Sequence, residues 1–200
     1  MDKPARSRLP DELLARIAAA GRPDEFEEIV ARYRTRVYRI CYRMAGNVED
    51  AEDWAQECLV RVYRQLPHYK PSLPFAPWLL RVVSNTCLNL MRGRARTTGK
   101  RENGLGEEAA GSSREFDPEQ ILLSTTRARE ILGALESLNP TLKQAVVLRV
   151  VEDLSLREVA EVLGVPLQTA ASRVRRALES VRMRLRQNGC DDRDECEVGR

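Results

Sequence analysis

The sequence has few of the residues from which enzyme sites are built. Its 200 residues include a single histidine, His68, so sites that need several histidines, such as histidine metal triads and HExxH helices, are excluded. It contains no GxxxxGKS or GxxxxGKT phosphate loop, and no GxGxxG follows a strand-like segment. We therefore expect a protein without a catalytic site, a metal site or a cofactor.

Long hydrophobic runs are also missing. The chain is 42% hydrophobic and 32% charged, and no stretch approaches the roughly 20 apolar residues that a membrane helix needs. The apolar run at 13–20 is short, is interrupted by Arg16 and follows no basic region, which excludes a secretory signal. We expect a cytoplasmic protein without direct membrane insertion.

Cysteines are few and odd in number, which argues against a disulfide framework. The first three lie on or beside apolar helix faces and are interpreted as small core residues. The last two lie in an acidic tail that we interpret as frayed, and two thiols without a histidine are a poor metal-ligand set. Whether these two thiols sense a metal or redox state is left open. The five cysteines are Cys41, Cys58, Cys87, Cys190 and Cys196.

What the sequence does contain is helical periodicity. Residues 24–45, about 48–66 and a segment starting near Phe75 carry apolar residues at i, i+3, i+4 and i+7 spacing. A shorter helix at about 11–20 precedes them. Gly46 is expected to end the first long helix, because glycine readily adopts the left-handed conformation of a C-cap. No segment alternates with a period of two, so we predict an all-α fold.

Composition divides the chain into two small helical domains. The segment between them is rich in glycine, poor in apolar residues and without periodicity, as in a flexible linker. The second domain is expected to hold helices at 118–137 and about 140–152, the latter burying Val150. The predicted boundaries are 1–93 for the first domain, 94–117 for the linker, 118–187 for the second domain and 188–200 for the acidic tail.

Residues 154–186 predict a helix-turn-helix. Ser155 and Glu158 form a capping box, Gly164 suits the turn, and a second helix begins near Leu167. An ordinary helical hairpin with a basic face remains the alternative. The outward residues on the first turns of the second helix are types that reach base edges or phosphates in a major groove: Gln168, Thr169, Ser172, Arg173 and Arg176.

Three segments resemble parts of bacterial sigma factors. The motif running from Asp50 to Arg64 (DAEDWAQECLVRVYR) resembles the helix that binds core RNA polymerase. The segment from Phe75 to Arg92 is similar to the promoter-melting helix, and residues 138–182 resemble the domain that reads the minus-thirty-five element. These segments follow one another in the family's order. The extracytoplasmic-function type of sigma factor, which has two such domains and a linker, is the best match.

The resemblance implies three sets of contact residues. The outward residues of the helix-turn-helix named above are expected to contact the minus-thirty-five element and form the minus-thirty-five set. Tyr69 or Phe75 is expected to stack on a base flipped from the minus-ten element. The core-polymerase-binding set is Asp50, Asp53, Gln56, Glu57 and Arg61, and the minus-ten set is His68, Tyr69, Lys70, Phe75, Arg81, Asn85, Asn89 and Arg92.

The resemblance also implies partners. They are promoter DNA and core RNA polymerase, contacted at the clamp helices of its largest subunit and at its flap region, with an anti-sigma protein as the expected inhibitor. The sequence departs from the family's pattern at Gln168, where a small residue is usual, and at Ala170-Ala171, where Val-Lys is common. We therefore expect weaker or altered minus-thirty-five recognition.

Two other functions compete with this interpretation. A stand-alone helix-turn-helix transcriptional regulator with a helical sensing or dimerisation domain would bind duplex DNA tightly without polymerase. A helical scaffold without a nucleic-acid role would show no salt-dependent affinity for DNA.

Overall fold

The computed structural model describes residues 8–98 and 126–187, and these ranges contain helices and no strand, which confirms the all-α prediction. None of the helices in these ranges is long and apolar enough to cross a membrane. The first half comprises α2 (Asp11–Ala19), α3 (Pro23–Ala45), α4 (Val48–Gln65), the 3-10 helix η1 (Leu66–His68) and α5 (Phe75–Thr98). The second half comprises α7 (Thr126–Glu136), α8 (Pro140–Val146), the π-helix η2 (Val147–Val151), α9 (Leu156–Leu163) and α10 (Leu167–Gln187).

The ends of α3 and α4 follow from their capping residues. Gly46 ends α3 in the left-handed conformation, with φ of 88°, and its N–H donates to the Tyr42 carbonyl, as predicted. The Asn47 side chain then caps α4 by accepting a hydrogen bond from the Asp50 N–H at 2.9 Å. The two helices therefore form an antiparallel pair with almost no connecting loop.

The core of the first half is built around Phe75, which is fully buried at the start of α5. Its ring lies 5.7 Å from Tyr33, 5.3 Å from Tyr69 and 5.5 Å from Trp78, measured between centroids. These separations are those of favourable aromatic pairs. The cluster fixes where the loop after α4 joins α5.

The helix-turn-helix forms as the sequence predicts. The Ser155 N–H donates to Glu158 Oε2 at 2.7 Å and the Glu158 N–H donates to Ser155 Oγ at 3.3 Å, which completes the capping box. Gly164 ends α9 with φ of 64° and leads into α10.

The helix expected at 140–152 is interrupted by the π-helix η2, and the predicted burial of Val150 is wrong. The Glu152 N–H donates to the Val147 carbonyl, five residues back, at 3.3 Å. The extra residue in that turn rotates the side chains that follow it. Val150 is therefore 59% exposed, whereas Val147 and Leu148 at the start of the turn are buried.

Helix α5 also differs from the prediction, because it continues to Thr98, beyond the expected start of the linker at residue 94. The backbone keeps its helical hydrogen bonds past the point where apolar periodicity ends. The rest of the predicted linker and the residues up to 125 lie outside the described part of the chain.

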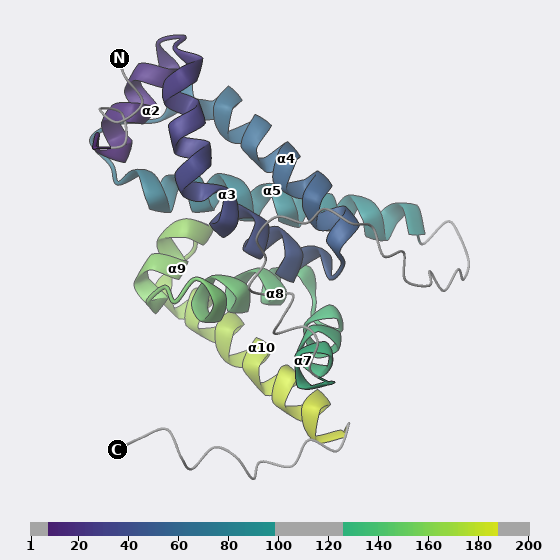
Figure 1. Ribbon diagram of the computed structural model, residues 1–200. Helices are drawn as coiled ribbons and strands as arrows, with labels where there is room; N and C mark the ends of the chain where they lie inside the picture. The colour runs from purple at the N-terminus through teal and green to yellow at the C-terminus, as the bar shows by residue number, and fades with distance from the viewer. Residues whose placement is uncertain (1–7, 99–125, 188–200) are drawn as a thin grey trace.

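The two halves pack directly on each other. Figure 1 shows α3 and α5 lying across the second half, where they contact α8, η2 and α9. One hydrophobic core continues through both halves and includes Phe75 and Val83 together with Leu148 and Val159. A smaller cluster within the second half surrounds Ala177.

A buried carboxylate joins the two halves. Glu152, which follows η2, forms a salt bridge with Arg36 of α3 and lies 3.5 Å from the Arg39 guanidinium. The Glu152 side chain is only 1% exposed, whereas the two arginines are 28% and 37% exposed. Because a buried charge needs a partner, this carboxylate favours the closed packing of the halves.

We expect Glu152→Gln to loosen that packing by about 1–3 kcal/mol, since the ion pairs with both arginines are lost, together with the charge that strengthens the hydrogen bond from Arg36. Small-angle X-ray scattering should then report a larger radius of gyration. Glu179→Gln is the matched control, because it removes an ion pair with Arg175 within α10. Equal radii for the two variants would contradict this role of Glu152.

Candidate nucleic-acid interface

Four residues of the predicted core-binding set form one exposed stripe on α4. Asp53, Gln56, Glu57 and Arg61 are exposed because the opposite face of the helix is buried against α3 and α5. Asp50 is half-buried and differs from the other four. It accepts a hydrogen bond from Asn47 Nδ2 at 2.7 Å and pairs with Arg94 of α5, so it also ties the start of α4 to α5.

The loop between α4 and α5 does not present the aromatic surfaces that the sequence suggested. Tyr69 is 6% exposed and Phe75 is fully buried, so neither ring is available to stack on a base in this conformation. The Tyr69 hydroxyl donates to the Leu73 carbonyl and closes the loop. Apolar rings gain more by packing together than by facing water, which explains the difference. His68 and Lys70 are exposed on the loop.

The polar residues of the minus-ten set form a stripe on α5. Arg81, Asn85 and Asn89 follow one another at four-residue spacing and are exposed, and Arg92 is exposed further along the helix. The first three line a cleft of about 310 Å³ together with Arg61 of α4. The fold thus brings one end of the predicted polymerase stripe beside the predicted DNA stripe.

The second half covers part of this α5 stripe. Asn85 Oδ1 accepts a hydrogen bond from Gln144 Nε2 of α8 at 3.3 Å. The Arg81 guanidinium lies against Gly164, and a Cβ atom at that glycine would be 3.0 Å from it. Gln144 was not among the predicted residues, and no local signal marks it, because α8 also contains the polar residues Thr141 and Lys143.

The recognition residues of the helix-turn-helix lie on the first turns of α10. Gln168 and Arg176 are exposed, while Thr169, Ser172 and Arg173 are half-buried. They lie opposite a packed face made by Ala170, Val174 and Ala177, each at most 5% exposed. This geometry suits a helix that offers polar groups to a groove, and the contacts themselves stay predictions.

Lys143 was also missed by sequence reasoning. It lies on α8, is 1% exposed and lines a cleft of about 320 Å³ between the halves together with Glu136 and Arg94. Burial lowers the pKa of Lys143 to about 8, with Glu136 acting in the opposite direction and Arg94 lowering it further. The cleft thus holds an ammonium group that is costly to keep charged.

Comparison with known sequences matches both halves. Residues 29–97 match Sigma-70 region 2, and residues 128–181 match Sigma-70 region 4. The chain is 32% identical over 177 residues to the ECF RNA polymerase sigma factor SigW of Bacillus subtilis, covering 83% of this chain and 91% of that protein. It is 28% identical over 179 residues to the ECF RNA polymerase sigma-E factor of Escherichia coli, covering 87% of this chain and 93% of that protein.

A third relative is longer than the matched region. The chain is 38% identical over 158 residues to the ECF RNA polymerase sigma factor SigE of Mycolicibacterium smegmatis, covering 78% of this chain and 60% of that protein.

Solved structures share the fold. CnrH, in complex with the cytosolic domain of CnrY, superposes with a TM-score of 0.65 at 23% identity, covering 89% of this chain and 98% of CnrH. The sigma factor RpoE of Bartonella quintana, in complex with the anti-sigma factor NepR, superposes with a TM-score of 0.62 at 18% identity, covering 81% of this chain and 97% of RpoE.

The buried ammonium group makes stability depend on pH. Below pH 8 Lys143 is charged in the folded and unfolded states, and the folded state bears the burial cost. As pH rises from about 8 toward 10.5, the ordinary pKa of a lysine, the folded lysine loses its proton before the unfolded one does, so this contribution to stability rises.

We expect Lys143→Met to raise the free energy of unfolding by about 1–3 kcal/mol at pH 7. The gap from wild type should narrow by pH 10. Denaturant unfolding of both proteins at pH 7, 8.5 and 10 measures this gap. Tyrosines and cysteines titrate in both proteins, so their contribution to the pH dependence cancels in the difference. A gap that stays constant with pH would contradict the lowered pKa.

Proposed function

The chain belongs to the sigma-70 family as an extracytoplasmic-function sigma factor that directs transcription initiation, and we propose how its surfaces divide that work. The α4 stripe binds core RNA polymerase, the α5 stripe captures unpaired bases of the minus-ten element, and α10 reads the minus-thirty-five duplex. The observation that carries the proposal is the cleft in which Arg61 of α4 meets Arg81, Asn85 and Asn89 of α5.

Binding of the polymerase is assigned to the α4 stripe by its exposure and its charge. Asp53 and Glu57 lie one turn apart, and Arg61 follows one turn later, so one face offers both signs to a charged partner helix. We assign the partner helix to the clamp helices of the largest polymerase subunit, and the flap region contacts the second half.

Base capture is assigned to polar groups, because the rings of Tyr69 and Phe75 are buried. The side-chain amides of Asn85 and Asn89 have donors and acceptors that match unpaired base edges. We assign Arg81 and Arg92 to phosphates, since both are exposed cations of α5, and His68 and Lys70 are exposed on the loop that precedes this helix. Promoter opening then draws on binding energy alone, and we propose no covalent step.

The closed packing implies a step before DNA binding. In this conformation Gln144 holds Asn85, and Gly164 lies against Arg81, so these two exposed residues lose their contacts with the second half only when the halves separate. We propose that core polymerase separates them by binding each half, and that an anti-sigma protein opposes this separation. The work takes place in the cytoplasm, where polymerase and promoter DNA are found.

An apolar groove supports a protein partner on the second half. It encloses about 310 Å³ and is lined largely by apolar residues of α7, α8, η2 and α10, among them Ile131, Val150 and Val181. Val150 is 59% exposed, and such a residue gains when a partner covers it. The groove suits the apolar face of an anti-sigma helix.

Run-off transcription tests the proposal. Purified core polymerase is combined with a promoter library with and without this chain, and specific starts should appear only when the chain is present. Tight duplex binding without polymerase would instead indicate the stand-alone regulator. No salt-dependent DNA affinity in either setting would indicate a scaffold.

Reversing one charge of the α4 stripe should weaken core binding. We expect Glu57→Lys to lower the affinity for core polymerase by roughly tenfold, about 1.4 kcal/mol, while circular dichroism stays unchanged. Glu27→Lys, on the exposed side of α3, is the matched control and should bind normally. Co-elution with core polymerase measures both, and equal retention of the two variants would remove Glu57 from the interface.

Two arginines of α10 should differ in their effect on promoter choice. Arg173 lies on the first turns, where its planar group can reach a guanine edge, so Arg173→Ala should cost about 1–3 kcal/mol and relax preference at one or two base pairs. Arg182 lies further along and is exposed. Arg182→Ala should lower the affinity for all DNA sequences alike. It should also reduce the slope of log affinity against log salt concentration by roughly one, the value for one phosphate contact.

Both arginine variants are to be measured as holoenzyme on a randomised minus-thirty-five library. An Arg173 variant that keeps the wild-type base preference and only binds more weakly would place Arg173 on phosphate instead.

A further inference from the structure

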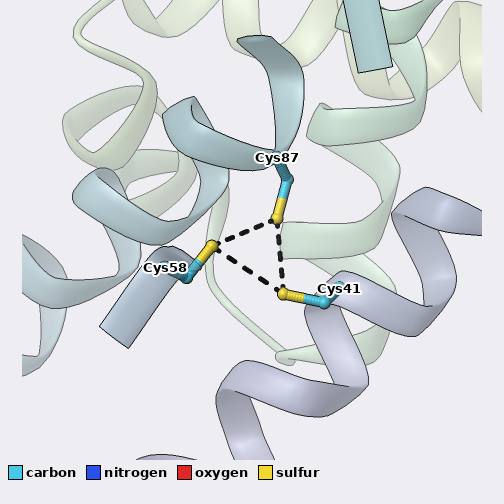
Figure 2. A group of neighbouring side chains, drawn as sticks. All are labelled: Cys41, Cys58 and Cys87. Carbon is cyan, nitrogen blue, oxygen red and sulfur yellow. Dashed lines mark hydrogen bonds between the residues drawn. The ribbon is translucent and has the colours of Figure 1, made fainter. Parts of the chain in front are cut away.

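Three cysteines from three helices meet in the core of the first half. Cys41 comes from α3, Cys58 from α4 and Cys87 from α5, and Figure 2 shows their side chains pointing toward one another. The sulfur atoms lie 3.5 Å apart for Cys41 and Cys87, 3.7 Å for Cys58 and Cys87, and 3.8 Å for Cys41 and Cys58. All three are free thiols with fully buried side chains.

The triangle of sulfurs has the size of a metal-thiolate site. An ion at its centre lies about 2.1 Å from each sulfur, close to the Zn–S bond of about 2.3 Å, so an ion slightly out of the plane fits with little movement. Core packing alone explains one buried cysteine, but here every sulfur contacts the other two.

The number of donors restricts which ion suits the site. Among the described residues, the group within ligand distance holds these three cysteines and no histidine or carboxylate. Zinc in proteins takes four ligands, and iron–sulfur clusters also need four. Solvent does not supply the fourth, because the side chains are fully buried.

Soft thiolate ligands select soft ions, and among these Cu(I) is satisfied by three sulfurs. We propose that Cys41, Cys58 and Cys87 form a three-thiolate site for a soft monovalent ion of the Cu(I) type. Binding forms three sulfur–metal bonds and releases the thiol protons to solvent, with no change of oxidation state. The site differs from the polymerase and DNA surfaces, since it lies inside the first half.

The position of the site connects it with those surfaces. Cys58 follows Glu57 of the α4 stripe, and Cys87 lies between Asn85 and Asn89 of the α5 stripe. An ion bound to all three sulfurs would fix α3, α4 and α5 relative to one another. This consequence for polymerase and DNA binding rests on the proposed function, whereas ion binding itself does not.

Anaerobic titration with Cu(I) tests the site in the full chain. The tail thiols are removed by Cys190→Ser and Cys196→Ser, so that the cluster supplies all remaining cysteines. The ion is offered both to the native protein and during refolding, because the cluster is closed to solvent. Competition with a colorimetric Cu(I) chelator gives the affinity and the stoichiometry.

We expect one Cu(I) per chain and an X-ray absorption spectrum with three sulfur neighbours at about 2.3 Å. Adding Cys58→Ala or Cys87→Ala to this background should weaken binding by more than roughly 100-fold, above the loss caused by removing an outer-shell partner. Circular dichroism checks that each variant stays folded. If one of the two variants does not fold, the other still tests the site.

Three results would overturn the proposal. They are Cu(I) binding no stronger than that of the variant with all three cluster cysteines changed to alanine, a spectrum with fewer than three sulfurs, and tighter binding of Zn²⁺ than of Cu(I). Since the readout is ion binding, it is independent of the run-off assay. The chain can fail to direct transcription and still bind Cu(I), or it can direct transcription without binding Cu(I).

Discussion

Helix α5 has to pack on two sides at once, and much of the remaining structure depends on that constraint. One side contacts α3 and α4, and the other contacts α8 and α9. Leu79 and Val83 are fully buried, so the helix has little surface left for polar groups. Arg81, Asn85 and Asn89 occupy that remaining strip, and the second half must therefore lie close to the residues proposed to hold DNA.

This arrangement makes domain packing and promoter binding compete for the same strip of α5. The closed form uses Asn85 for a hydrogen bond with Gln144 and places the buried Glu152 between two arginines of α3. Each of these polar contacts is modest, but separating the halves also exposes apolar residues of the shared core, so polymerase binding has to supply free energy for both. In the proposed function, polymerase binding therefore releases Asn85 and Arg81 from the second half as well as recruiting the factor.

Local signals in the sequence predicted most of the fold. Apolar spacing located the helices, and Gly46, Gly164 and the capping box fixed helix ends, because these features act within a few residues. The sequence did not predict the π-turn at 147–151, since packing against α3 decides that register. The site was harder still.

The helix faces of the site residues were predictable, but their neighbours were not. Burial of Phe75 with Tyr69, and the meeting of three thiols, arise from contacts between segments far apart in the chain, which periodicity does not encode. Gly46 also contacts a segment far away in the chain, although it lies in a turn whose conformation is local. Its missing side chain leaves room that Glu136 of α7 fills, while φ of 88° already disfavours other residues. A larger residue there would have to displace the Glu136 carboxylate as well as adopt a strained turn, so one position affects both how α3 ends and where a side chain of the second half lies.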